Sequence, residues 1–240
     1  MANTPLIIFT HVPKVAGTSL RREVIYSNIP MERIKQYHGI KNLIRSDSHG
    51  FDAIVGHSPY GIHDFVRKKS VYITMLRDPV QRSISHYYFI KQPAEVKGWE
   101  NTQQKKIHTE SNLSDIFHST RNKRWRLGGT WLMDNLMTRY LSGYRYFWMK
   151  KNSRTLLDKA KNNLEKKYVE FGIQEQYEAS ANAIANALSL ERVPLAGDTK
   201  LKRTLCKPAA SPEELEAIRD NNELDMELYR FAVDLFNSRR

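Results

Sequence analysis

The segment HVPKVAGTSL, residues 11–20, follows the apolar run LIIFT and has the composition of an anion-binding loop. A strand that leads through a tight loop into a helix presents free backbone N–H groups and the positive end of the helix dipole. Lys14 adds a positive charge within this loop. Thr18 and Ser19 add hydroxyl donors, and Gly17 lets the backbone approach a ligand closely. The segment lacks the G-x-x-x-x-G-K-[ST] pattern that holds the phosphates of ATP, so it predicts either another phosphate-like ligand or a plain strand–helix turn.

A second candidate for anion binding is LRDPVQRSISHYYF, residues 76–89, which follows the apolar run SVYITML. Arg77 leaves the end of this expected strand, and Ser85 lies eight positions later on the expected helix. A guanidinium fork and a hydroxyl group could together hold a second phosphate. The alternative is that Arg77 pairs with Asp78 or binds a backbone carbonyl.

His57 is the candidate general base, because it lies just past the apolar run FDAIVG, where an α/β sheet places its ligands. The unperturbed pKa of histidine, about 6.5, suits proton transfer near neutral pH. His63 is the alternative base. We expect His11 to support the loop and His86 to pack within its helix.

Basic and aromatic side chains offer a candidate surface for binding a sugar or an acidic ligand. Three tryptophans and four basic residues could form a groove that stacks sugars and binds acidic groups, or they could pack as core and rim: Trp99, Trp125, Trp131, Arg121, Lys123, Arg124 and Arg126. Asn135 and Arg139 lie four positions apart on one side of an expected helix. They could line the cleft or bond to their neighbours.

Strands and helices are expected to alternate along the chain, which predicts an α/β fold with a central, mostly parallel sheet flanked by helices in three layers. Four apolar runs predict strands: residues 6–10, 51–57, 70–76 and 168–173. Helices are expected from Thr18 or Ser19, and over residues 80–91, 130–143, 153–168, 175–190, 213–220 and 225–236. Asp78 followed by Pro79 predicts an N-cap, and Ser211 with Pro212 and Glu214 predicts a capping box. No linker is visible, so we expect a single domain over residues 1–240.

The composition favours a soluble globular protein with anionic partners. Hydrophobic residues make up 40% and charged residues 27% of the 240 residues, so disorder is not expected. The net charge is +12, which favours a nucleotide, an acidic polysaccharide, a nucleic acid or a membrane surface. The single cysteine, Cys206, allows no intrachain disulfide. No apolar run approaches the roughly 18 residues needed to span a bilayer, and we expect a cytoplasmic protein without a membrane span.

Together, HVPKVAGTSL and RDPVQRSISHYY resemble the motifs of sulfotransferases that use 3′-phosphoadenosine-5′-phosphosulfate (PAPS). The resemblance is closer to the carbohydrate branch, which includes heparan sulfate and uronyl 2-O-sulfotransferases and bacterial relatives. IVGHSPYG is similar to the segment that carries the catalytic histidine of that branch, and DNLMTRYLSG to its middle helix. TKLKRTLCKP and NNELDMELYRFAVDLF are similar to its late cofactor loop and terminal helices. Val15 stands where the family usually has Thr.

This resemblance implies a role for each candidate residue. The loop would hold the 5′-phosphosulfate through Lys14, Ala16, Gly17, Thr18, Ser19 and Leu20. Arg77 and Ser85 would hold the 3′-phosphate, and a late loop would close over the nucleotide with Lys202, Arg203 and Thr204. Lys14 would stabilise the leaving phosphate, His57 would act as the base, and no metal would be needed. A polysaccharide hydroxyl group is the leading acceptor, and a glycolipid, a small metabolite or a tyrosine side chain are the alternatives. Independently of the resemblance, the residue types make Asn135, Arg139, Arg124 and Trp125 candidate acceptor contacts.

Two other function classes compete with this interpretation. A small-molecule kinase of the P-loop type would need Mg²⁺ and a lysine followed by Ser or Thr, but Lys14 is followed by Val15. A non-enzymatic protein that binds nucleic acid or heparin would account for the net charge of +12. None of the common nucleic-acid-binding motifs is present, so no nucleic-acid partner is expected.

Overall fold

A central sheet of five parallel strands organises the protein in the computed structural model, which describes residues 4–44, 50–91, 134–147, 154–195 and 209–240. The strand order is β2-β3-β1-β4-β5. The strands are β1 (Leu6–Thr10), β2 (Ile34–Gln36), β3 (Ala53–Gly56), β4 (Ser70–Leu76) and β5 (Tyr168–Ile173). The predicted α/β fold is thus confirmed, with a sheet that is parallel throughout.

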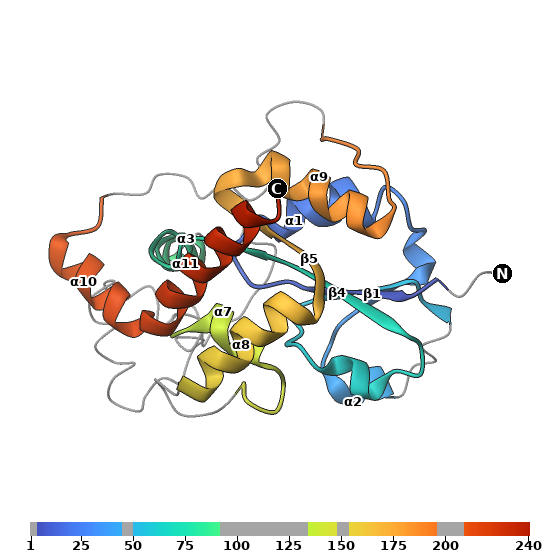
Figure 1. Cartoon of the computed structure of the whole chain (residues 1–240), viewed down its shortest axis with the longest axis horizontal. Coiled ribbons are helices and arrows are strands. Elements are labelled where there is room, and N and C mark those ends of the chain that lie inside the picture. Colours follow the sequence, from blue (N-terminus) through green and yellow to red (C-terminus); the bar gives the residue numbers. More distant parts are fainter. Residues whose placement is uncertain (1–3, 45–49, 92–133, 148–153, 196–208) are drawn as a thin grey trace.

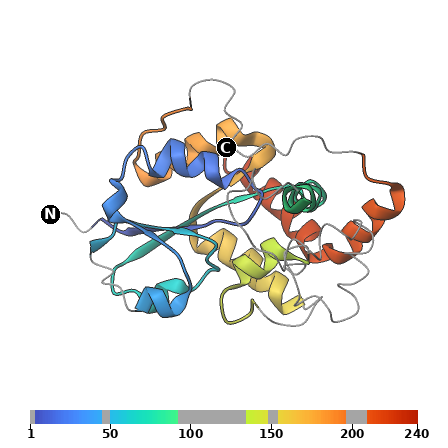
Figure 2. The same ribbon diagram turned by 180° about the vertical axis from the view of Figure 1, so that it is seen from behind.

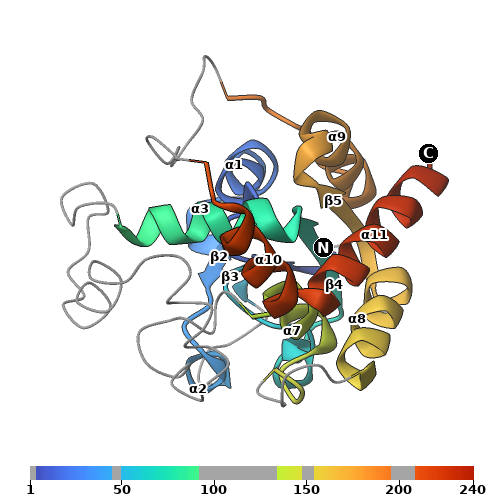
Figure 3. The same cartoon turned by 90° about the vertical axis from the view of Figure 1, so that its left-hand side faces the viewer.

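Helices cover both faces of this sheet, so the molecule has three layers (Figure 1). The α-helices are α1 (Gly17–Leu20), α2 (Ile40–Ile44), α3 (Pro79–Lys91), α7 (Leu136–Ser142), α8 (Arg154–Lys166), α9 (Tyr177–Leu188), α10 (Pro212–Asn221) and α11 (Glu223–Ser238). Short 3-10 segments are η2 (Met31–Arg33), η4 (Ile62–Phe65) and η7 (Gln174–Gln176), and α1 continues as the π-helical turn η1 (Arg21–Ile25). Helices α1 and α9 lie on one face, and α2, α7 and α8 lie on the other (Figures 1 and 3).

Helices α3 and α10 lie beyond the carboxyl ends of the strands, far from the N-terminus (Figures 1 and 2). Helix α11 contacts α8, α7 and the edge strand β5. A covered edge strand cannot pair with another chain, so α11 closes this side of the sheet. No helix in the described ranges is long and apolar enough to cross a membrane.

The central strands are buried on both sides, which explains their continuous apolar sequences. All five residues of β1 are buried, and so are the last five residues of β4. Aliphatic side chains from α1, η1, α8 and α9 pack onto these strands and complete one large core. A smaller cluster joins α3 to α10 through Val80, Ile84, Tyr87 and Ile218.

Strand register brings three loops to one edge of the sheet. In the parallel pairing, Thr10 of β1 lies opposite Gly56 of β3 and opposite Thr74 of β4. The chain therefore leaves β1, β3 and β4 at neighbouring points of the carboxyl edge. The segments that follow are the loop at residues 11–16, His57 and Arg77.

The four predicted strands are confirmed, and the predicted caps are present. The Asp78 Oδ1 atom accepts a hydrogen bond of 2.8 Å from the Gln81 backbone N–H at the start of α3. Ser211 and Glu214 form a reciprocal capping box at the start of α10. One strand and one α-helix were missed, β2 and α2, because each is short and has only one buried residue, which leaves no periodic pattern to detect.

The helix predicted over residues 130–143 begins later than expected. Residues 130–133 lie outside the described ranges, and Asn135 has a left-handed backbone with a φ of 45°, so α7 starts at Leu136. Gly143 follows this helix with a φ of 110°, which confirms the predicted stop.

Asp52 joins the amino ends of three strands. Its carboxylate accepts a hydrogen bond of 2.8 Å from Arg33 Nη2 and one of 3.0 Å from Lys68 Nζ. Arg33 lies just before β2 and Lys68 lies just before β4. The Arg33 hydrogen bond is the largest cause that lowers the pKa of Asp52 from 3.8 to about 2, and Lys68 acts in the same direction.

We expect this carboxylate to support the fold above pH 4 and to lose its effect in acid. Because the pKa is lower in the folded protein, the contribution is complete above the unfolded value of 3.8 and disappears as the pH falls towards about 2. In urea unfolding between pH 2 and pH 7, Asp52→Asn should lower the free energy of unfolding at pH 7. The further decrease of this free energy between pH 3.8 and about pH 2 should be smaller in the variant than in the unmodified protein. The control is Asp158→Asn, which changes an exposed aspartate on α8. Equal pH profiles for Asp52→Asn and the unmodified protein would contradict the expectation.

Candidate active site

The loop after β1 is held in a conformation that costs free energy. Lys14 and Ala16 have left-handed backbones with φ angles of 71° and 61°, although neither is a glycine. Such residues cost of order 1 kcal/mol each and cluster at functional sites. The Ala16 carbonyl accepts hydrogen bonds from the Ser19 and Leu20 N–H groups, at 3.0 and 3.2 Å, and so winds the chain into α1.

The loop is anchored on one side and accessible on the other. Val15 is fully buried in the core, so its side chain serves packing. Lys14, Thr18 and Ser19 are half-buried and present polar atoms at the carboxyl edge. The replacement of the usual Thr by Val15 therefore changes the buried side of the loop.

Arg77 fixes the loop from the end of β4. Its Nη1 atom donates a hydrogen bond of 3.1 Å to the carbonyl of Lys14, one of the two left-handed residues. Its Nε atom is buried and has no hydrogen-bond partner among the described residues. Burial lowers the pKa of Arg77, while Glu175 and Asp78 oppose this change. A half-buried guanidinium with an unused donor is suited to bind an anion.

Lys14 reaches towards α3. Its Nζ atom lies 4.2 Å from the centre of the Phe89 ring, a distance typical of a cation–π contact. Ser85 lies on the same helix and is only 4% exposed. The structure thus brings Lys14, Arg77 and α3 together, and a contact between Ser85 and a ligand stays a prediction.

His57 has a defined tautomer because of its partner. Its Nδ1 atom lies 2.7 Å from the backbone carbonyl oxygen of His11. A carbonyl oxygen can only accept, so Nδ1 carries the hydrogen and Nε2 holds the lone pair in the neutral ring. The side chain is exposed at the carboxyl edge. This is the protonation state that a general base requires.

His63 has the opposite tautomer. The Tyr72 hydroxyl oxygen accepts hydrogen bonds from the Gly61 and His63 backbone N–H groups, at 3.2 and 3.0 Å. The hydrogen of the Tyr72 hydroxyl group then points to His63 Nδ1, and the hydroxyl oxygen lies 3.0 Å from this nitrogen. Burial raises the pKa of Tyr72, so the phenol keeps this hydrogen. The Nε2 atom of neutral His63 is therefore an N–H group, and it lies 3.5 Å from Asp64 Oδ1. A ring in this state does not accept a proton at Nε2.

Two further histidines, His11 and His86, lie inside the protein. His11 is 8% exposed, and its ring packs on Phe9 and His57 beside the loop. His86 is 4% exposed on α3. These positions agree with the support and packing roles expected from the sequence.

Asn135 takes part in a mutual capping of two helices. Its Oδ1 atom accepts hydrogen bonds from the Leu224 and Asp225 N–H groups at the start of α11, at 2.9 and 3.1 Å. In return, the Asp225 carboxylate accepts from the Met137 and Thr138 N–H groups at the start of α7, at 3.0 and 2.7 Å. Each helix thereby satisfies free N–H groups of the other.

Arg139 is also bonded within the protein and is 5% exposed. Its Nη2 atom pairs with Asp134 Oδ2 at 3.0 Å, and its Nη1 atom donates to the Phe147 carbonyl at 3.1 Å. For Asn135 and Arg139, the structure favours bonds to neighbours over a place in the acceptor cleft. Five other candidates lie outside the described residues: Arg124, Trp125, Lys202, Arg203 and Thr204. The tryptophans Trp99 and Trp131 and the basic residues Arg121, Lys123 and Arg126 lie outside them as well.

Sequence reasoning missed a buried charged network behind the site. Arg82 of α3 is completely buried, and burial lowers its pKa to about 10. The nearby Asp225 opposes this change, and Arg77 adds to it. The segment RDPVQR offered a signal, because its second arginine, Arg82, falls on the predicted helix and could face inward there. Glu175, directly after β5, was also missed; it accepts from the Asp78 N–H and the Tyr229 hydroxyl, at 3.2 and 2.8 Å.

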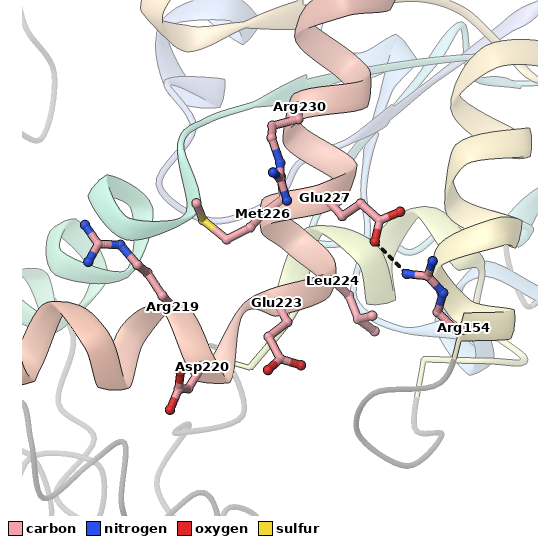
Figure 4. Close-up of a pocket in the computed structure, with 8 residues that line it drawn as sticks. All are labelled: Arg154, Arg219, Asp220, Glu223, Leu224, Met226, Glu227 and Arg230. Atoms are coloured by element: carbon pink, nitrogen blue, oxygen red, sulfur yellow. Dashed lines mark hydrogen bonds and ion pairs between the residues drawn. The ribbon is translucent and has the colours of Figure 1, made fainter.

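A separate groove lies between α10, α11 and the start of α8 (Figure 4). Its volume is about 460 Å³, and it is lined by Arg154, Arg219, Asp220, Glu223, Leu224, Met226, Glu227 and Arg230. Arg154 and Glu227 form an ion pair across it at 2.6 Å. The lining combines three arginines with three carboxylates and includes no residue of the loop, so we do not assign it to the anion site. Within the described ranges, no group of three or more His, Cys, Asp or Glu side chains could hold a metal ion.

The fold and the site define an α/β protein with a candidate anion-binding loop after its first strand and a histidine hydrogen-bonded to that loop. Comparison with known families is consistent with this class. A family model described as "Sulfotransferase family" matches residues 1–232, and the chain therefore belongs to the sulfotransferase family.

Curated relatives carry heparan sulfate in their names. Heparan sulfate 2-O-sulfotransferase 1 of Xenopus laevis is 25% identical over an alignment of 264 residues, which covers 96% of this chain and 70% of that protein. The Mus musculus protein of the same name is 23% identical with the same coverage. Heparan-sulfate 6-O-sulfotransferase 2 of Danio rerio is 26% identical over 277 residues, which covers 98% of this chain and 58% of that protein.

We expect Asn135→Ala to destabilise the fold, because it leaves the Leu224 and Asp225 N–H groups without their acceptor. Buried donors without partners cost about 1–3 kcal/mol, and the left-handed backbone adds to this cost for alanine. Urea unfolding measures the change, and Asn42→Ala on the exposed face of α2 is the matched control. Unchanged stability together with a raised KM for the acceptor would instead support the cleft role.

Proposed function

We propose that this sulfotransferase moves a sulfuryl group from PAPS to a hydroxyl group of a carbohydrate acceptor, with His57 as the general base. The proposal rests mainly on the contacts between the segments that follow β1, β3 and β4 at one edge of the sheet. Arg77 binds the Lys14 carbonyl at 3.1 Å, and His57 binds the His11 carbonyl at 2.7 Å. These contacts support a site that combines the loop after β1, the Arg77 cation and the imidazole of His57.

The loop supplies the groups that would hold the 5′-phosphosulfate of the donor. Backbone N–H groups at the start of α1 and the hydroxyl groups of Thr18 and Ser19 are suitable donors; Ala16, Gly17 and Leu20 contribute only backbone. Lys14 would stabilise the negative charge that develops on the leaving 5′-phosphate. A sulfuryl group carries less charge than a phosphoryl group, so fixed N–H groups and a lysine can serve without a metal clamp.

Arg77 is the main candidate for the 3′-phosphate of the donor. Its buried Nε donor has no partner among the described residues, and a phosphate oxygen would satisfy it. Ser85 would add a hydroxyl group from α3. Lys202, Arg203 and Thr204 remain part of the proposal as the loop that closes over the nucleotide.

His57 would remove the proton of the acceptor hydroxyl group as its oxygen attacks sulfur. The new S–O bond forms in line with the S–O bond that breaks to the 5′-phosphate, which leaves as part of 3′-phosphoadenosine-5′-phosphate (PAP). The proton goes to Nε2, since Nδ1 is already occupied by its hydrogen bond to His11. His57 then carries a positive charge until solvent removes the proton.

The acceptor is proposed from the relatives and from charge. The aligned relatives are named for heparan sulfate, and two positions of sulfation occur among them, 2-O and 6-O. A net charge of +12 also favours an acidic polymer over a neutral one. Arg124 and Trp125 stay in the proposal as acceptor contacts.

Donor recognition is tested by calorimetry without metal. PAP should bind to the protein, and adenosine 5′-phosphate, which lacks the 3′-phosphate, should bind at least tenfold more weakly, because the Arg77 contact is lost. Arg77→Gln should reduce this preference, and Lys161→Gln on α8 is a matched control away from the loop. Tight binding of ATP with Mg²⁺ would instead favour a small-molecule kinase of the P-loop type. Salt-dependent binding of DNA without binding of PAP would favour a non-enzymatic protein that binds nucleic acid or heparin.

The choice of base is tested by His57→Ala and His63→Ala. Loss of a general base costs about 10²- to 10⁴-fold in rate, so kcat for sulfuryl transfer to heparan sulfate should fall by this factor in His57→Ala. Its affinity for PAP should change little. His63→Ala removes the hydrogen bond to Tyr72 and should lower the free energy of unfolding. The kcat of the molecules that remain folded should change little. A larger loss of kcat in His63→Ala than in His57→Ala would overturn the assignment.

A further inference from the structure

His11 contacts the loop and the candidate base at the same time. Its ring is stacked on Phe9, with centroids 5.3 Å apart and planes at 11°. It also lies against the His57 ring, at 4.8 Å and 31°. Since His11 is only 8% exposed, its ring is enclosed by these neighbours just after the end of β1.

The same ring explains why residue 17 is a glycine. A Cβ atom at Gly17 would lie 2.2 Å from His11 Cδ2 and 2.4 Å from His11 Nε2, distances at which something must move. The φ of Gly17 is outside the left-handed region, so backbone freedom is not the reason. Gly17 begins α1, where the free N–H groups of the loop are presented. The glycine thus provides the space that lets the His11 ring lie against the anion-binding backbone.

The backbone of His11 completes the connection. Its carbonyl oxygen binds His57 Nδ1 at 2.7 Å, which orients the imidazole and selects its tautomer. One residue therefore determines the position of His57 through its carbonyl and its ring, and touches the start of α1 with that ring.

From these contacts we propose that His11 is a positioning residue that holds the base at a fixed place relative to the loop. The inference rests on the proposed function, because it takes His57 as the base and the loop as the donor site. Sulfuryl transfer needs the attacking oxygen, sulfur and leaving oxygen in line, and a misplacement of about 1 Å can cost about 10²-fold in rate. The His11 side chain lies against both His57 and the start of α1, so it can hold the base at the distance from the loop that in-line attack needs.

A double-mutant cycle tests the link. Gly17→Ala should lower kcat by about 10²-fold, because its methyl group displaces the His11 ring. In a His11→Ala background the methyl group has space, so the same substitution should cost several-fold less. Gly50→Ala is the matched control, since Gly50 has no atom within 4 Å of an added Cβ and no left-handed backbone. Equal effects of Gly17→Ala in both backgrounds would overturn the proposal.

A second comparison covers the case in which Gly17→Ala does not fold. His11→Ala should lower kcat while the affinity for PAP, measured by calorimetry, changes little. His11→Phe keeps a ring against Phe9 and His57 and should recover part of that kcat. Equal kcat values for His11→Ala and the unmodified protein, or for His11→Phe and His11→Ala, would contradict the positioning role, whatever their stability.

His57→Ala separates this proposal from the proposed function. If His57 is the base, adding His11→Ala to His57→Ala should lower kcat little further, because the positioned group is already gone. An unchanged kcat in His57→Ala alone would overturn the base assignment of the proposed function. A large loss in His57→Ala with no loss in His11→Ala would overturn the positioning proposal alone.

Discussion

The parallel register of β1, β3 and β4 is the constraint on which the site depends. Thr10 lies opposite both Gly56 and Thr74, so three strands release their chains at one edge of the sheet. The two hydrogen bonds that build the site, from His57 to the His11 carbonyl and from Arg77 to the Lys14 carbonyl, each join two of these strand ends. A slip of one residue would turn the following side chains to the other face and break both bonds.

Behind this edge, a buried polar network fixes the helix that follows Arg77. Arg82 of α3 lies near Asp225, which caps α7, and Asn135 of the α7 end caps α11 in return. A buried charge is tolerated only when partners satisfy it, so these groups allow few alternative arrangements of the helices. The network thus links α3 to the starts of α7 and α11, and its three members, Arg82, Asp225 and Asn135, are all buried.

The two histidines between β3 and β4 show how a hydrogen-bond partner selects the tautomer of an imidazole. His57 faces a carbonyl oxygen, which only accepts, and so keeps its lone pair on Nε2. His63 faces a phenol that already accepts two N–H groups and must donate, which places the hydrogen on Nε2 instead. The same side chain becomes a suitable base at one position and part of a structural cluster at the other.

The sequence by itself determined the features that depend on near neighbours. Continuous apolar runs predicted four strands because both faces of a parallel sheet are buried, and Asp78 and Ser211 predicted helix starts because a cap bonds within three residues. The tertiary structure decided the rest: the inward direction of Asn135 and Arg139, the different hydrogen-bond partners of His57 and His63, and the space that Gly17 leaves for His11. The edge strand β2 also depends on its pairing with β3, since three residues carry no pattern of their own. These outcomes rest on contacts between residues far apart in the chain, such as the 46 positions from His11 to His57 and the 63 from Lys14 to Arg77. No local pattern specifies such contacts, because they form only when the strands are placed side by side.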